Sequence, residues 1–153
     1  MSPTELAAVL IDRVGNTYIF ACFCVVSIIA LWYFGYGSLA FTVGLALIVV
    51  VVVVNALKLA IRAKRLDGAL VKTKLGAFPS GHAAASASLA VLVPYTAFVI
   101  EPSVALPLGF FVALIALLVS ISRVVVRAHT PSQVLAGAIL GIALPIATIF
   151  VAA

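Results

Sequence analysis

The chain holds only two histidines, and each stands where a helix is expected to begin. His82 ends the stretch 78–82, with the sequence FPSGH, which precedes a run of small residues. Ser80 is a good helix N-cap, Gly81 lets a ligand approach the main chain closely, and the free N–H groups of a helix start favour an anion. The stretch therefore predicts an anion site beside His82. A capped helix that carries an interfacial histidine explains the same residues equally well.

The second histidine, His129, also precedes an expected helix. Thr130 is predicted to be the N-cap of that helix, with Pro131 at its first position and Gln133 at its third, which together form a capping box. His129 is therefore expected beside a second helix start.

Cations accompany both histidines, among them Arg123 and Arg127. An arginine side chain presents a planar fork that suits phosphate oxygens. The chain has no carboxylate cluster and no cysteine set of the kind that holds a metal, because Cys22 and Cys24 lie two apart in an apolar run and point to different sides of a helix. The pattern predicts a phosphate pocket with one histidine as nucleophile and the other as acid, without a metal.

The composition places these residues in a membrane. Of the 153 residues, 66% are hydrophobic and 8% are charged, whereas a soluble domain carries about 25% charged residues. Soluble globular, disordered and fibrous proteins are therefore excluded. The net charge of +5 does not indicate a nucleic-acid partner, because most of the chain has no solvated face; membrane lipids and phosphate are the expected partners of the basic residues.

Five stretches are long and apolar enough to cross a bilayer, since a helix needs about 20 mostly apolar residues to do so. An amphipathic interfacial helix is expected before them, within residues 2–15. The prediction is one all-α domain over residues 1–153, a polytopic helix bundle with spans at Thr17–Phe34, Leu39–Leu57, Ala83–Ile100, Val104–Ile121 and Val134–Ala153.

The number of spans brings the chemically interesting residues together. With five alternating spans, the end of the second and fourth and the start of the third and fifth lie at one membrane face. Residues Lys58–Arg65, Ser80–His82 and Arg123–His129 are therefore expected to converge there. Ionisable residues gathered at one end of a membrane bundle indicate a functional site.

At these residues the chain resembles the type-2 phosphatidic acid phosphatase (PAP2) superfamily of membrane lipid phosphatases. The family has three signatures: Lys, six residues, Arg-Pro; Pro-Ser-Gly-His; and Ser-Arg, five residues, His, three residues, Asp. The likeness extends from about Lys58 to Gly141. The signatures correspond to Lys58 and Arg65 with Leu66 in place of the proline, to residues 79–82 in full, and to Ser122, Arg123 and His129 with Gln133 in place of the Asp.

The resemblance implies a metal-independent phosphatase with no cofactor, acting on a phosphomonoester or diphosphate of a polyprenyl lipid or a phosphoglycerolipid. It implies that His129 attacks phosphorus to form a phosphohistidine and that His82 protonates the leaving oxygen. The implied phosphate-binding residues are Lys58, Arg65, Ser80, Gly81 and Arg123, and Arg127 is a candidate for an additional substrate contact.

Gln133 is the serious departure from the family pattern. The family's Asp fixes the tautomer of the nucleophilic histidine and stabilises its protonated form, as in hydrolase triads. Oε1 of Gln133 can accept a hydrogen bond from His129 Nδ1, but it brings no negative charge. We expect weakened catalysis; the alternative is a catalytically silent scaffold that binds a lipid phosphate in the same pocket.

The charges also favour one membrane face. All nine Lys and Arg residues fall on the side of the predicted site, and Glu101 falls on the other. Setting aside the three that are expected to bind phosphate leaves six cations against none, so the positive-inside rule predicts a cytoplasmic site in the plasma (inner) membrane. Members of the family more often work at the outer face, so the two arguments disagree. The sequence makes no prediction of oligomeric state.

Overall fold

The computed structural model describes residues 6–7, 17–63 and 76–152. Across these ranges it has no strand, which confirms the expected all-α fold. The long helices in this part of the chain are α2 (Thr17–Tyr33), α3 (Gly37–Ile61), α4 (Gly81–Ile100), α5 (Pro102–Val125) and α6 (Pro131–Ala152).

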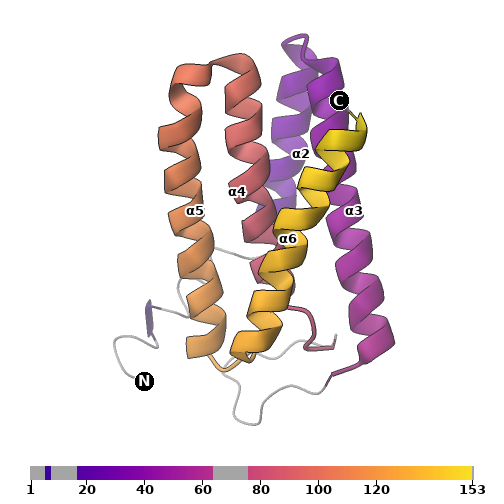
Figure 1. The fold of residues 1–153 in the computed structure, drawn as a ribbon, viewed down its shortest axis with the longest axis vertical. Coiled ribbons are helices and arrows are strands. Elements are labelled where there is room, and N and C mark those ends of the chain that lie inside the picture. The colour runs from indigo at the N-terminus through magenta and orange to yellow at the C-terminus, as the bar shows by residue number, and fades with distance from the viewer. Residues whose placement is uncertain (1–5, 8–16, 64–75, 153) are drawn as a thin grey trace.

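The helices run up and down along one axis (Figure 1). Tight connections join α2 to α3 and α4 to α5 at one end of the bundle. The last turns of α3 and α5 and the first turns of α4 and α6 lie at the opposite end. Helix α4 packs most extensively against α5 and α6, α6 also packs against α3, and α2 packs chiefly against α3. The two expected helix starts therefore lie at the same end of the bundle.

Four of these helices, α3 to α6, are long and apolar enough to cross a membrane. Helix α2 is apolar but has 17 residues, about 26 Å at 1.5 Å per residue, slightly less than the ~30 Å of the hydrocarbon core. The expected spans correspond to helices in each case. The expected interfacial helix falls on residues of which the structure describes only Leu6 and Ala7.

The interior of the bundle is built from small residues where α4 meets α6, and the outside is apolar. Ala83, Ala84 and Ala87 of α4 are buried. Large apolar side chains point outward instead, such as Leu106 and Phe150, both 84% exposed. Apolar exposure of this kind marks a membrane surface, so the chain is an integral membrane protein.

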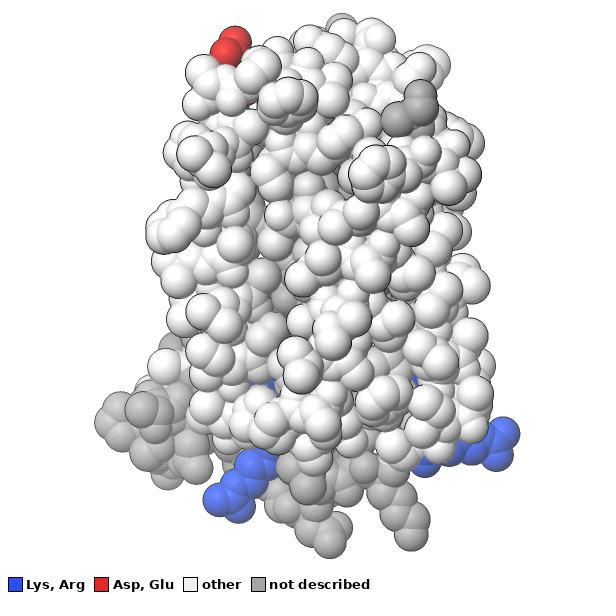
Figure 2. All heavy atoms as spheres, in the orientation of Figure 1, with Lys and Arg blue, Asp and Glu red and all other residues white. Residues whose placement is uncertain are grey.

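Among the residues that the structure describes, the charged side chains lie at the two ends of the bundle (Figure 2). The lysines and arginines that the structure describes lie at the end where α3 meets α4 and α5 meets α6. Glu101, between α4 and α5, lies at the other end. The described residues thus reproduce the separation of charge predicted from the sequence.

Candidate phosphate site

The main chain joins the two helix starts. The amide of Ser80 donates to the Gln133 carbonyl over 3.0 Å. In addition, Cβ atoms added at Gly137 and Gly141 would collide with the carbonyl oxygens of Ser80 and Ala84. Only glycine lets α6 approach α4 so closely. This contact fixes the start of α6, and with it His129, against the start of α4.

Ser80 caps α4 as predicted. Its side chain is fully buried, and its Oγ accepts from the Ala83 amide over 3.4 Å. A hydroxyl that accepts one hydrogen bond keeps its own proton to donate. The partly buried His82 follows in the first turn of the helix, next to amides that have no intrahelical partner.

Lys58 reaches the same helix start from the last turn of α3. Its ammonium lies so close to Gly81 that a Cβ atom there would be 2.8 Å from Nζ. The helix dipole and the ammonium therefore present positive charge at one place, which favours an anion. Gly81 provides the space that the ammonium occupies.

Arg123 lies in the last turn of α5 and is 1% exposed. Its main-chain oxygen accepts from the amides of Ala128 at 3.1 Å and His129 at 3.2 Å. The residue thus brings a cation into the bundle and also holds the backbone of the second histidine. The two hydrogen bonds to the Arg123 carbonyl hold the end of α5 against the residues that precede α6.

Arg127 has a different position from Arg123. It is exposed and has a positive φ of 54°, and its amide donates to Val124 over 3.0 Å while Ala128 donates to Arg123. This pair of hydrogen bonds is the Schellman motif that ends α5, with Arg127 in the left-handed position that glycine usually takes. Its contact with a substrate stays a prediction.

His129 is 3% exposed and has its Nδ1 in a defined environment. Nδ1 lies 2.8 Å from the carbonyl oxygen of Ala77 and 3.3 Å from Gln133 Oε1. The Ala77 carbonyl only accepts, so Nδ1 must carry the proton and donate it. In the neutral ring the lone pair is then on Nε2, which is the form that a nucleophilic histidine needs.

Gln133 makes both expected contacts, one with Thr130 in the capping box and one with His129. Its Oε1 accepts from the Thr130 amide over 3.1 Å, and its own amide donates to Thr130 Oγ1 over 3.3 Å, which is the predicted capping box. Because a main-chain N–H only donates, the side-chain atom that faces it is the oxygen, and that same atom faces His129. The geometric expectation for Gln133 is confirmed, while its effect on catalysis stays a prediction.

Comparison with known proteins agrees with the family resemblance seen in the sequence. A model of the PAP2 superfamily matches residues 35–152. The chain belongs to the PAP2 superfamily. The crystal structure of a transmembrane PAP2-type phosphatidylglycerolphosphate phosphatase from Bacillus subtilis has the same fold, with a TM-score of 0.88 and 23% sequence identity over 99% of this chain and 78% of that one. A comparison with curated sequences finds no match.

The structure describes two of the three PAP2 signatures completely and the first one only in part. The second and third lie within the described residues, as does Lys58 of the first. Arg65 and Leu66 lie outside them. Among the described residues, no group of three or more His, Cys, Asp or Glu side chains is placed to hold a metal ion.

Sequence reasoning missed Ala77. Its contribution is a carbonyl oxygen, which every residue carries, so the residue type gave no signal. The contact depends on the turn before α4, where the Ala77 amide donates to the Ala63 carbonyl over 2.9 Å. Only the fold brings that turn beside His129.

Proposed function

We propose that this PAP2 protein is a lipid-phosphate phosphatase that transfers the phosphoryl group to Nε2 of His129. The observation that carries the proposal is the hydrogen bond from His129 Nδ1 to the Ala77 carbonyl, because it assigns the ring proton to Nδ1 and makes Nε2 the unprotonated nitrogen of the neutral ring. Family membership and the Lys58 ammonium beside the start of α4 supply the context of an anion site.

The reaction proceeds in two steps. Nε2 attacks phosphorus, the bond from phosphorus to the lipid oxygen breaks, and His82 gives its proton to that oxygen. His82, now neutral, takes a proton from water as the water oxygen attacks phosphorus. The phosphorus–nitrogen bond breaks, and inorganic phosphate leaves. A monoester yields a lipid alcohol, and a diphosphate yields a lipid monophosphate.

The cations and donors stabilise the charge that grows on the phosphoryl oxygens in each step. Lys58 and the α4 amides beside Gly81 act from one side, and Arg123 acts from α5. Ser80 donates its hydroxyl, and Arg65 completes the set as the family pattern implies. The chemistry uses these groups in place of a metal ion or cofactor.

The substrate class is a phosphomonoester or diphosphate of a polyprenyl lipid or a phosphoglycerolipid. The Bacillus neighbour acts on phosphatidylglycerolphosphate by its description, which makes that lipid the first to test. The excess of cations at the site end favours a cytoplasmic site in the plasma membrane. A lipid phosphate made inside the cell would meet the site on that side.

A second function has one observation in its favour. Gln133 offers His129 a neutral acceptor where the family has a carboxylate. A pocket that binds a lipid phosphate without turnover, as a scaffold, is the function that this change would permit.

The test is phosphate release by the purified protein in detergent with a chelator present. The panel is phosphatidylglycerolphosphate, phosphatidic acid, a polyprenyl monophosphate, its diphosphate and a prenyl-linked sugar phosphate. We expect release from at least one lipid and none from His129→Ala, with Leu135→Ala, an exposed position on the helix that follows His129, as the control. Vanadate binding without release from any lipid would instead establish the scaffold.

A further inference from the structure

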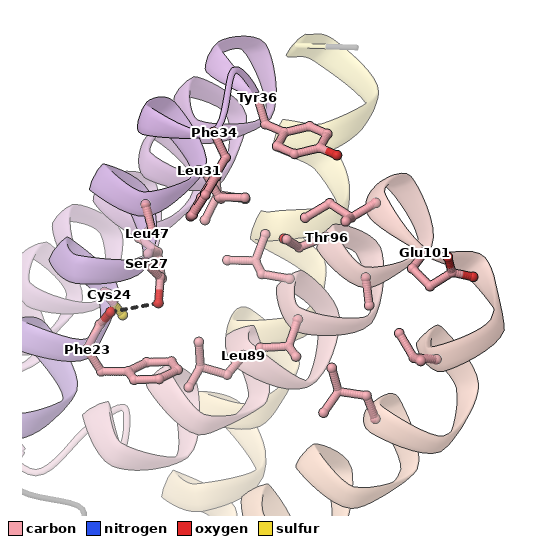
Figure 3. A pocket seen from close by; sticks show the side chains of 18 residues that line it. Phe23, Cys24, Ser27, Leu31, Phe34, Tyr36, Leu47, Leu89, Thr96 and Glu101 are labelled. Carbon is pink, nitrogen blue, oxygen red and sulfur yellow. Dashed lines mark hydrogen bonds between the residues drawn. The ribbon is translucent and has the colours of Figure 1, made fainter.

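A cavity of about 700 Å³ lies in the half of the bundle away from the phosphate site. It is lined by residues of α2, α3, α4 and α5, and its walls are almost entirely apolar (Figure 3). Phe23 and Leu89 lie at the inner end, whereas Tyr36 and Glu101 lie at the outer end, where the tight connections are. The cavity therefore has an apolar body and a polar rim.

The depth of the cavity matches one leaflet of a bilayer. Along α4, its lining extends from Leu89 to Glu101, about 18 Å at 1.5 Å per residue. Half of a ~30 Å hydrocarbon core is about 15 Å. Leu89 is also about 12 Å along the helix from Gly81. A hydrocarbon chain that enters at the rim would thus end near the bilayer centre, short of the phosphate site.

The charge at the rim selects the head group. Glu101 Oε1 accepts from the Ser103 hydroxyl over 2.6 Å and from its amide over 3.4 Å. These hydrogen bonds hold the pKa of Glu101 below its usual value, so the carboxylate is charged at neutral pH. The described lysines and arginines all lie at the other end of the bundle. The rim therefore attracts a cationic group and repels an anionic one.

We propose that this cavity binds one hydrocarbon chain of a lipid from the leaflet opposite the phosphate site, and that this lipid has an amine in its head group. The amine lies beside the Glu101 carboxylate and the Tyr36 ring, and the chain fills the space between α2 and α4. Since α2 packs chiefly against α3, the lipid supplies the contact that joins α2 to the other side of the bundle. The proposal does not depend on the phosphatase activity.

Native mass spectrometry tests the head-group preference. The purified protein in detergent is mixed with equal amounts of phosphatidylethanolamine and phosphatidylglycerol that have identical chains. We expect about a two- to fivefold preference for the amine lipid, the range that one exposed ion pair provides. Glu101→Gln removes the charge while its side-chain oxygen still caps α5, and it should make the two adducts equal.

A second pair of variants tests the cavity itself. Leu89→Trp fills the inner end and should lower both adducts severalfold. Leu106→Trp adds the same side chain at a position that points outward from α5, and it should bind both lipids as the wild type does. Equal retention of the two lipids by the wild type, or an undiminished preference in Glu101→Gln, would overturn the proposal. A lipid-free dimer would also overturn it, by assigning the cavity to a second copy of the chain.

Discussion

Replacing Gln133 by alanine distinguishes the contributions of the two oxygen atoms that lie within hydrogen-bond distance of His129 Nδ1. The variant loses the Oε1 contact at 3.3 Å and keeps the Ala77 carbonyl at 2.8 Å. The loss at His129 is then one hydrogen bond, a net contribution of about 0.5–1.5 kcal/mol, while the lost acceptor of the Thr130 amide affects the start of α6. At 1.36 kcal/mol for each factor of ten, that is about a 2- to 13-fold reduction in kcat. A wrong tautomer would cost far more, on the order of 10⁴-fold in a serine-protease triad.

The assay measures phosphate release at saturating lipid, together with the midpoint of thermal unfolding. Thr130→Val is the matched control, because it removes the hydroxyl half of the capping box but keeps the Thr130 amide and both acceptors of His129. We expect a similar loss of stability from both variants and a larger loss of rate from Gln133→Ala. A reduction of 10³-fold or more in a folded Gln133→Ala protein would refute the role given to Ala77.

The opposite change restores the family's residue. Gln133→Asp brings a carboxylate towards His129 and should preserve or raise the rate, because negative charge stabilises the imidazolium that forms during catalysis. A carboxylate also favours the protonated ring before reaction, so the acidic limb of the pH–rate profile should move to higher pH. A lower rate across the whole profile would show that the amide is a tuned feature of this site.

Three further substitutions test the positions of the helices and the charges. Gly141→Ala places a methyl group against an α4 carbonyl and should cost about 1–3 kcal/mol of stability and most of the activity. Gly44→Ala is the control, because its methyl group meets only an ordinary van der Waals contact. Thermal unfolding and phosphate release should show that the control is tolerated. Gly81→Ala displaces the Lys58 ammonium and should raise KM for the lipid phosphate at least severalfold, with little change in melting temperature. Arg127→Gly removes the strain of a left-handed residue, so its free energy of unfolding in denaturant should be about 1 kcal/mol higher than that of Arg127→Ala. Equal rates of phosphate release by the two variants would assign any loss of activity to the missing charge.

The fold was largely predictable because each membrane crossing leaves a hydropathy signal. The predicted span Leu39–Leu57 corresponds to α3, which continues to Ile61. The hydropathy signal weakens where Lys58 and Arg62 appear, but the helix does not need to stop there. Long basic side chains extend from a helix end towards water, so the backbone hydrogen bonds continue past the first charge.

The site was predictable where side chains form local hydrogen bonds. Thr130 and Gln133 are three residues apart, and the capping box that their types predicted is present. The Ala77 carbonyl was not predictable, because main-chain oxygens have no sequence signature and this one lies 52 residues from His129. The cavity beside α2 was not predictable either, since its walls are apolar residues like those of the lipid-facing surface.

A rapid-quench labelling experiment can show whether His129 carries the phosphoryl group. The protein is mixed with the preferred lipid carrying ³²P in its terminal phosphate, quenched under alkaline conditions and digested, and the labelled peptide is sequenced by mass spectrometry. We expect an acid-labile phosphohistidine at His129 that is absent from His129→Ala. Turnover with no label on His129, or label on another residue, would show that His129 is not the nucleophile.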